Sequence, residues 1–170
     1  MKISLSRSSI LTALAIAILL AALPGAIARL ARTGNPYLLT QQFFEDILAR
    51  LSGPGRLRFI LQPLTAALLG LRDGKKDSQA GCPPFLVALV CHRAHRSNLL
   101  RSAFASVRDL VAIAVILDLI SQFLIFREVR PGAALVLGPM LIAVPYSISR
   151  ALANRVARRG SQRAPVTRPS

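Results

Sequence analysis

The chain has 170 residues, 22 Lys plus Arg against 7 Asp plus Glu, and a net charge of +15, yet 53% of its residues are hydrophobic. An ordinary soluble domain has about 25% charged residues, whereas the charged fraction here is 17%. Trp is absent and aromatic residues make up 5%, which argues against a base-stacking surface for nucleic acid. The basic residues fall in clusters between apolar runs, so we expect a membrane protein that binds no nucleic acid.

The first apolar run, residues 9–28, is long enough to cross a membrane. Its 20 residues give about 30 Å of α-helix, the thickness of the hydrocarbon core. Small residues recur in it every four positions and predict a face that another helix can approach closely in lipid. They are Ala13, Ala17, Ala21 and Gly25. A cleaved signal peptide is the alternative, because residues 26–28 (Ala-Ile-Ala) resemble a cleavage site. We expect the run to be retained as a span.

The segment 36–51 has the pattern of an amphipathic helix. Asn35 and Pro36 favour a helix start at this point. Two sets of side chains then recur at helical spacing: the apolar Phe43, Phe44, Ile47, Leu48 and Leu51, and the polar Gln41, Gln42, Glu45, Asp46 and Arg50. We expect the helix to lie on the membrane surface or against a helical bundle, with Glu45 and Asp46 as solvated charges.

A second apolar run, residues 57–71, is short for a span. Its 15 residues give about 22 Å of helix, and Arg58 and Gln62 fall within it. Either the run crosses where the bilayer thins locally, or it is a re-entrant or interfacial helix. We expect a crossing, followed by a basic connector, residues 72–108, in which Gly74, Gly81, Pro83 and Pro84 interrupt regular structure.

The third and fourth runs, residues 110–126 and 132–149, predict a helical hairpin, because only residues 127–131 separate them. We expect one membrane domain, residues 1–158, followed by a disordered basic tail, residues 159–170. The predicted fold class is all-α: a multi-pass helical membrane protein with three to four transmembrane helices plus an amphipathic interfacial helix.

The basic residues predict the orientation of the chain. Seven of them lie in the connector 72–108 and six lie after Ser149, whereas two lie in the hairpin turn 127–131. Cytoplasmic segments carry the excess of Lys and Arg, so the connector and the tail should be cytoplasmic and the turn should lie outside. Four spans place both termini in the cytoplasm, and three spans place the N-terminus outside. We expect four.

Asp118 is the only acid inside an apolar run, and it stands at the centre of residues 110–126. An acid at mid-bilayer costs about 2.5–3.5 kcal/mol on insertion, and Ser121 and Gln122 share its helix face. This polar stripe should face other helices or a partner. One interpretation is an ion or proton relay with Asp118 as the carrier. The interpretation we favour is a neutral Asp118 that is hydrogen-bonded across helices, for example to Gln62.

Basic residues just after the second run are candidates for binding anionic lipid headgroups. Arg72, Lys75 and Lys76 stand within five positions of one another at the expected cytoplasmic boundary, where anionic lipid attracts basic residues. Asp73 and Asp77 beside them are expected to make ordinary surface ion pairs, which contribute little.

No motif predicts a catalytic, metal or cofactor site. The chain has no phosphate-binding glycine loop, no nucleophile elbow and no His-Glu-x-x-His pattern. Cys82, Cys91, His92 and His95 lie close together in the sequence, but their spacing matches no usual zinc pattern. We therefore expect no cofactor, no metal ligand and no catalytic residue.

Four stretches of the sequence resemble a family of small bacterial integral membrane proteins of uncharacterised function. They are RFILQP (58–63), LRDGKKDSQAGCPPF (71–85), HRSNLLRS (95–102) and DLISQFLIFREVRPGAALVLG (118–138), and the resemblance covers about residues 56–155. It implies a helical fold in the bacterial inner membrane and no particular activity. Cys82 and Cys91 are not features of that family.

These features predict a non-catalytic accessory or scaffold protein that packs with itself or with a membrane-protein partner. The absence of catalytic motifs, the small-residue stripe in 9–28 and the polar stripe around Asp118 favour this function. The alternative is a small transporter or channel-like oligomer that uses Asp118, and a third hypothesis is a lipid-acting enzyme with its chemistry near residues 72–77. The bilayer itself, through its anionic headgroups, is the other expected partner.

Overall fold

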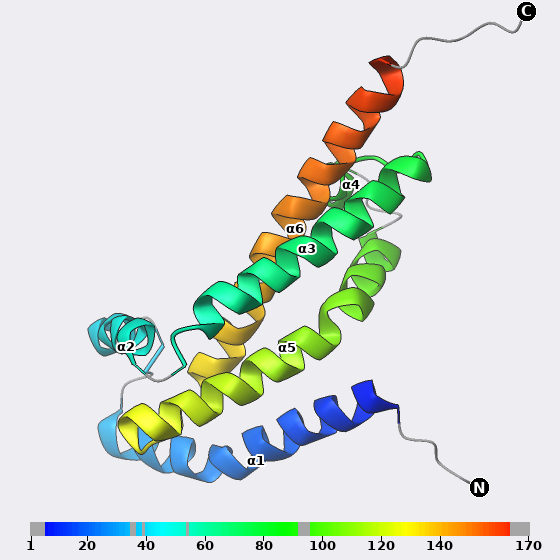
Figure 1. Cartoon of the computed structure of the whole chain (residues 1–170). Coiled ribbons are helices and arrows are strands. Elements are labelled where there is room, and N and C mark those ends of the chain that lie inside the picture. Colours follow the sequence, from blue (N-terminus) through cyan, green and yellow to red (C-terminus); the bar gives the residue numbers. More distant parts are fainter. Residues whose placement is uncertain (1–5, 35–36, 39, 54, 92–95, 164–170) are drawn as a thin grey trace, which may run out of the picture. The chain divides into compact units, whose positions relative to one another are not determined.

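The computed structural model describes residues 6–34, 37–38, 40–53, 55–91 and 96–163, and within these ranges the chain forms helices and no strands (Figure 1). The six helices are α1 (Arg7–Thr33), α2 (Gln41–Ser52), α3 (Arg58–Gln79), α4 (Phe85–Cys91), α5 (Arg96–Phe126) and α6 (Pro131–Arg163). The predicted all-α class is confirmed for the described part of the chain.

Contacts divide the chain into two compact units. The first unit combines residues 1–63 with 107–142, and the second combines residues 64–106 with 143–170. Because the boundaries cut α3, α5 and α6, each of these helices contributes to both units.

Three of the described helices are long and apolar enough to cross a membrane. They are α1, α5 and the part of α6 that ends at Arg159. The second predicted span belongs to α3, which is not among the three. Large apolar side chains are exposed on these helices, whereas many buried side chains are polar or charged. Such a distribution suits lipid, because the lipid tails cover the apolar surface and polar groups must be paired inside the protein.

In the first unit, α1 runs parallel to α5 (Figure 1). Near the start of α1, Ser8 donates a hydrogen bond to Asp109. In its middle, Ile18 and Leu19 pack against Val115, Leu119 and Ala134. Near its end, Arg29 forms an ion pair with Glu128, just beyond α5, at 2.5 Å. Because residue numbers rise together along both helices, the N-terminal ends of α1 and of this part of α5 lie on the same side.

The hairpin of α5 and α6 packs closely through small residues in the first unit. A Cβ at Gly138 would lie 3.0 Å from the Val115 side chain, which indicates how near the two backbones approach. Ala133 and Ala134 are fully buried. Ala133 and Leu137 also form a small core with Phe43 of α2, which places α2 against the start of α6.

In the second unit, α3 runs parallel to α6. A Cβ at Gly70 would overlap the backbone of Tyr146 and the side chain of Ser149, and a Cβ at Gly74 would overlap the backbone of Arg150. The pair forms a Gly-x-x-x-Gly pattern, which allows helices in a membrane to approach closely. The predicted interruption at Gly74 is therefore wrong, because this glycine serves helix contact inside α3.

Several helix boundaries differ from the predicted ones. Helix α2 begins at Gln41, where the Thr40 side chain accepts a hydrogen bond from the Phe43 backbone N–H at 3.3 Å. Tyr37 lies outside it, so the predicted start at residue 36 is too early, and residues 35–36 themselves are outside the described ranges. At the other end, α6 continues to Arg163 and so enters the segment expected to be disordered.

Candidate functional site

A glycine-containing linker holds α2 and the start of α3 against α5. A Cβ at Gly53 would lie 3.0 Å from the Ile125 side chain. Gly55 has φ of 91°, and a Cβ there would lie 2.6 Å from Ser121 Oγ. Both the positive φ and the lack of space favour glycine. The linker thereby brings the end of α2 and the start of α3 within one turn of Asp118.

Two arginines from the two sides of this linker converge on Asp118. Arg58, the first residue of α3, donates from Nη2 to Asp118 Oδ1. Arg50, in the last turn of α2, places Nη1 3.5 Å from Asp118 Oδ2. The side chains of all three residues are 5% exposed or less. The result is a buried cluster of two cations and one anion, and we call these three residues the Asp118 cluster.

A glutamine connects the Asp118 cluster to the hairpin turn. Gln122 Nε2 donates to Asp118 Oδ2 at 2.7 Å. The Gln122 Oε1 atom accepts a hydrogen bond from the Arg130 backbone N–H at 2.6 Å. Asp118 and Gln122 are one helical turn apart and fully buried. The predicted polar stripe of α5 therefore does face other parts of the protein.

The Asp118 carboxylate is bound to guanidinium groups and not to Gln62. Gln62 is buried on the same face of α3 as Arg58, one turn further on, but both of its side-chain polar atoms lack a hydrogen-bond partner. The geometry thus contradicts the expected hydrogen bond between Asp118 and Gln62. Ser121, the other member of the polar stripe, is buried and packs against Gly55 of the linker.

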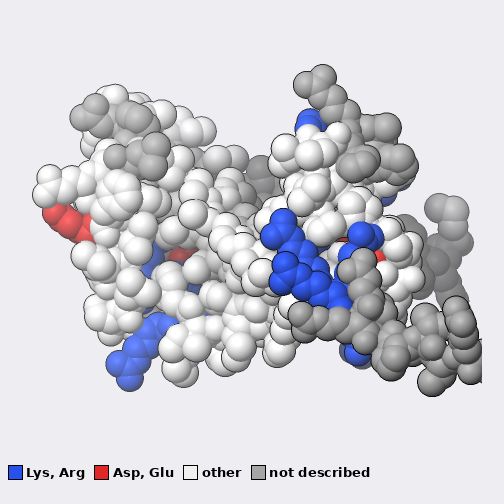
Figure 2. Space-filling view, turned by 90° about the horizontal axis from the view of Figure 1, so that it is seen from above, with Lys and Arg blue, Asp and Glu red and all other residues white. Residues whose placement is uncertain are grey.

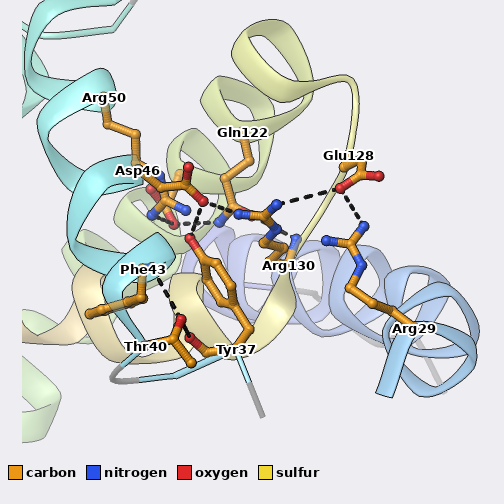
Figure 3. Close-up of polar contacts among 10 residues, drawn as sticks. Arg29, Tyr37, Thr40, Phe43, Asp46, Arg50, Gln122, Glu128 and Arg130 are labelled. Carbon is orange, nitrogen blue, oxygen red and sulfur yellow. Dashed lines mark hydrogen bonds and ion pairs between the residues drawn. The ribbon is translucent and has the colours of Figure 1, made fainter. Parts of the chain in front are cut away.

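A second set of polar contacts adjoins the Asp118 cluster on α2. Asp46, one turn before Arg50, accepts hydrogen bonds from Arg130 and, at 2.5 Å, from the Tyr37 hydroxyl (Figure 3). Arg130 also lies 3.6 Å from Glu128, which is the partner of Arg29. The expectation that Asp46 is a solvated charge is wrong, because Asp46 is buried and pairs with a partly buried arginine of the hairpin turn. Its neighbour Glu45 is exposed, as expected.

Helix α2 turns its charged face inward and much of its apolar face outward. Asp46 and Arg50 are buried, whereas Phe44, Leu48 and Leu51 are exposed. This is the reverse of a helix that covers a soluble core, and it suits a helix whose outer face meets lipid. Of the two predicted positions for this helix, on the membrane surface or against the bundle, the contacts with α5 and α6 favour the second.

The headgroup candidates lie on the outer face of α3. Arg72, Lys75 and Lys76 are exposed, while Asp73 and Asp77 are partly buried. Figure 2 shows Lys and Arg side chains gathered in a few groups on the face drawn, separated by uncharged surface. Arg72, Lys75 and Lys76 therefore remain available to headgroups, as their sequence positions suggested.

The two acids between these basic residues bind α6 within the second unit. Asp77 accepts from Arg150 Nε at 2.6 Å and from Nη2 at 3.0 Å, and Asp73 accepts from the Tyr146 hydroxyl at 2.8 Å. The expected surface pairs are thus replaced by a buried network, since Arg150 is 3% exposed. Arg150 also stacks on the Phe85 ring of α4, with Cζ 4.6 Å from its centroid.

The described residues contain no group of three or more His, Cys, Asp or Glu side chains that could hold a metal ion. His92 and His95 lie outside the described ranges. Cys82 and Cys91 are free thiols. No family model, curated protein or solved structure matches the chain.

Sequence reasoning missed the arginines of the Asp118 cluster. The sequence places Arg58 within an apolar run and Arg50 on the polar side of an amphipathic helix, and neither position identifies Asp118 as the partner. A signal was present, because Asp46 and Arg50 are one helical turn apart, as are Arg58 and Gln62. Polar residues at this spacing share a helix face, and a lone acid in a span has to be paired.

Replacing Asp118 with Asn should destabilise the protein strongly. The substitution preserves the shape of the side chain but leaves Arg50 and Arg58 without a counter-charge. Removing one partner of a buried ion pair costs about 3–5 kcal/mol of stability. The free energy of unfolding in neutral detergent is the measurement, with Glu45→Gln, an exposed acid on α2, as the matched control. A loss below about 1 kcal/mol for Asp118→Asn would show that the carboxylate does not balance the arginines.

Proposed function

We propose that the protein is a small, non-catalytic accessory or scaffold protein of the bacterial inner membrane. It crosses the membrane four times with both termini in the cytoplasm, and it assembles with a second copy or another membrane protein through α1. The topology and the assembly surface rest on different observations and have separate tests.

The parallel course of α1 and α5 supports four spans. Two parallel spans require an odd number of crossings between them. In the three-span arrangement no segment crosses the membrane between α1 and α5, so these two helices would be antiparallel. Of the described helices that lie between α1 and α5 in the sequence, α3 is the longest. Its apolar part, residues 58–71, gives about 21 Å of helix, so α3 crosses where the bilayer is locally thinner.

The basic residues agree with the same topology. Four spans place the N-terminus, the connector 72–108 and the tail in the cytoplasm, and the hairpin turn 127–131 outside. Arg32 and Gln42 then lie outside as well. Both line a polar hollow together with Glu128 of the hairpin turn, which supports placing all three on one side.

Cysteine labelling in intact cells tests the topology. In a Cys82→Ser, Cys91→Ser background, Gln42→Cys should react with a membrane-impermeant maleimide, as should Glu128→Cys, which marks the outside. Cys91, which is exposed and expected to be cytoplasmic, should react only after permeabilisation when it is the sole cysteine. Protection of Gln42→Cys in intact cells, with Glu128→Cys labelled, would instead support three spans.

The assignment as a scaffold rests on a difference between the polar stripe of α5 and the small-residue stripe of α1. The polar stripe of α5 is occupied by contacts within the chain, since Asp118 is fully buried and bound by Arg58 and Gln122. The small-residue stripe of α1 is on the surface. Its Ala13, Ala17 and Ala21 are exposed, and a Cβ at Gly25 would meet nothing within 4 Å. Such a face allows close helix packing in lipid.

Enlarging the stripe should disrupt assembly. Ala21→Leu together with Gly25→Leu would prevent close approach of another helix, whereas Leu20→Ala and Leu23→Ala change exposed large residues on the same helix. We expect at least a tenfold loss of cross-linked oligomer or of co-purified partner for the first pair only. A wild-type chain that is monomeric and partner-free in native membranes would contradict the proposal, and so would assembly that survives the first pair.

A further inference from the structure

Beside the hairpin turn three acids face four arginines, so Arg50 and Arg58 share the single charge of Asp118. In this part of the first unit, Asp118 binds Arg58, and Asp46 binds Arg130. Glu128, the third acid, binds Arg29. Arg50 is the additional cation, so the Asp118 cluster carries a net charge of +1. An unbalanced charge inside a membrane protein is strongly unfavourable.

Arg50 also retains all of its hydrogen-bonding capacity. Its side chain is fully buried, and Nε, Nη1 and Nη2 make no hydrogen bond. Its other contact is the Phe126 ring, whose centroid lies 5.7 Å from Cζ. Nearby, Arg58 Nε and both polar atoms of Gln62 are likewise buried and unpaired. Buried polar groups normally have partners, so this concentration of donors indicates a missing acceptor.

We propose that Arg50 and Arg58 bind a phosphate group at this position. A water molecule would satisfy donors but leave the charge, whereas a phosphate oxyanion supplies both acceptors and negative charge. The planar guanidinium group matches phosphate geometry with paired donors. The site is distinct from the exposed basic residues of α3, and it does not depend on the assignment as a scaffold.

In the proposed topology Arg50 lies at the level of the outer leaflet, beside the end of α5. Arg50 approaches Phe126, the last residue of α5, and Gly53 packs on Ile125. The adjoining linker residues Gly55 and Arg56 are exposed. Exposed leucines of α2, of the linker and of α3 lie near Arg50 in the sequence and suit the acyl chains of a phospholipid: Leu48, Leu51, Leu57 and Leu61.

Ligand titration of the purified full-length protein in neutral detergent tests the proposal. The probes are inorganic phosphate, phosphatidylglycerol and phosphatidylcholine at matched ionic strength, with the thermal midpoint and native mass spectrometry as readouts. We expect phosphatidylglycerol or phosphate to raise the midpoint and to bind at one molecule per chain. Stabilisation by inorganic phosphate alone would identify the free ion, and stabilisation by phosphatidylglycerol alone would identify the lipid.

Variants of Arg50 and Arg56 distinguish binding at a specific site from non-specific electrostatic attraction. Arg50→Gln should weaken binding at least tenfold, as expected for loss of charged hydrogen bonds, and Arg50→Lys should restore part of it. Arg56→Gln removes the same charge from the exposed linker and should change affinity less than threefold. Without ligand, Arg50→Gln should be at least as stable as the wild type, because it removes an unbalanced buried charge.

Three results would overturn the proposal. The first is a wild-type protein that neither phosphate nor phosphatidylglycerol stabilises beyond chloride and phosphatidylcholine. The second is equal loss of binding in Arg50→Gln and Arg56→Gln, which would indicate non-specific attraction. The third is a ligand-free Arg50→Gln protein as unstable as Asp118→Asn, which would show that Arg50 is already fully compensated.

Discussion

The structure of the first unit depends on a single carboxylate that faces two buried arginines. Asp118 receives Arg58 from the start of α3 and Arg50 from the end of α2. Neither cation can be buried in lipid surroundings without an anion. The linker between α2 and α3 must therefore lie directly against α5, and Gly53 and Gly55 are the residues that allow this approach. Through Gln122, the same carboxylate is connected to the backbone of the hairpin turn.

The same requirement explains the inverted distribution of polar and apolar residues. Once Asp46, Arg50 and Arg58 turn inward to meet their partners, the leucines of α2 and α3 have to face outward. An outward apolar face is favourable only beside lipid or another membrane helix. The second unit repeats this pattern, with Asp77 and Arg150 paired inside and exposed leucines on the same helices.

The helical class and three of the long apolar helices were predictable from hydrophobic runs, because a span needs only length and apolar composition. The buried position of Asp118 was also predictable, since a lone acid in a run must be paired. Its partners were not, because Arg50 and Arg58 lie in short polar or mixed segments whose contacts depend on the tertiary fold. Gly74 was misinterpreted for a related reason: within a membrane helix, a glycine can allow another helix to approach closely without interrupting its own helix.

We expect Asp118 and Arg58 to form the dominant buried ion pair and Arg50 to be only weakly coupled to the carboxylate. A double-mutant cycle measures this directly, with Asp118→Asn, Arg58→Gln and Arg50→Gln unfolded reversibly in the same detergent. We expect a coupling free energy above about 1.5 kcal/mol for Asp118 with Arg58 and a clearly smaller one for Asp118 with Arg50. Coupling within about 0.5 kcal/mol of zero for Asp118 with Arg58 would contradict the account.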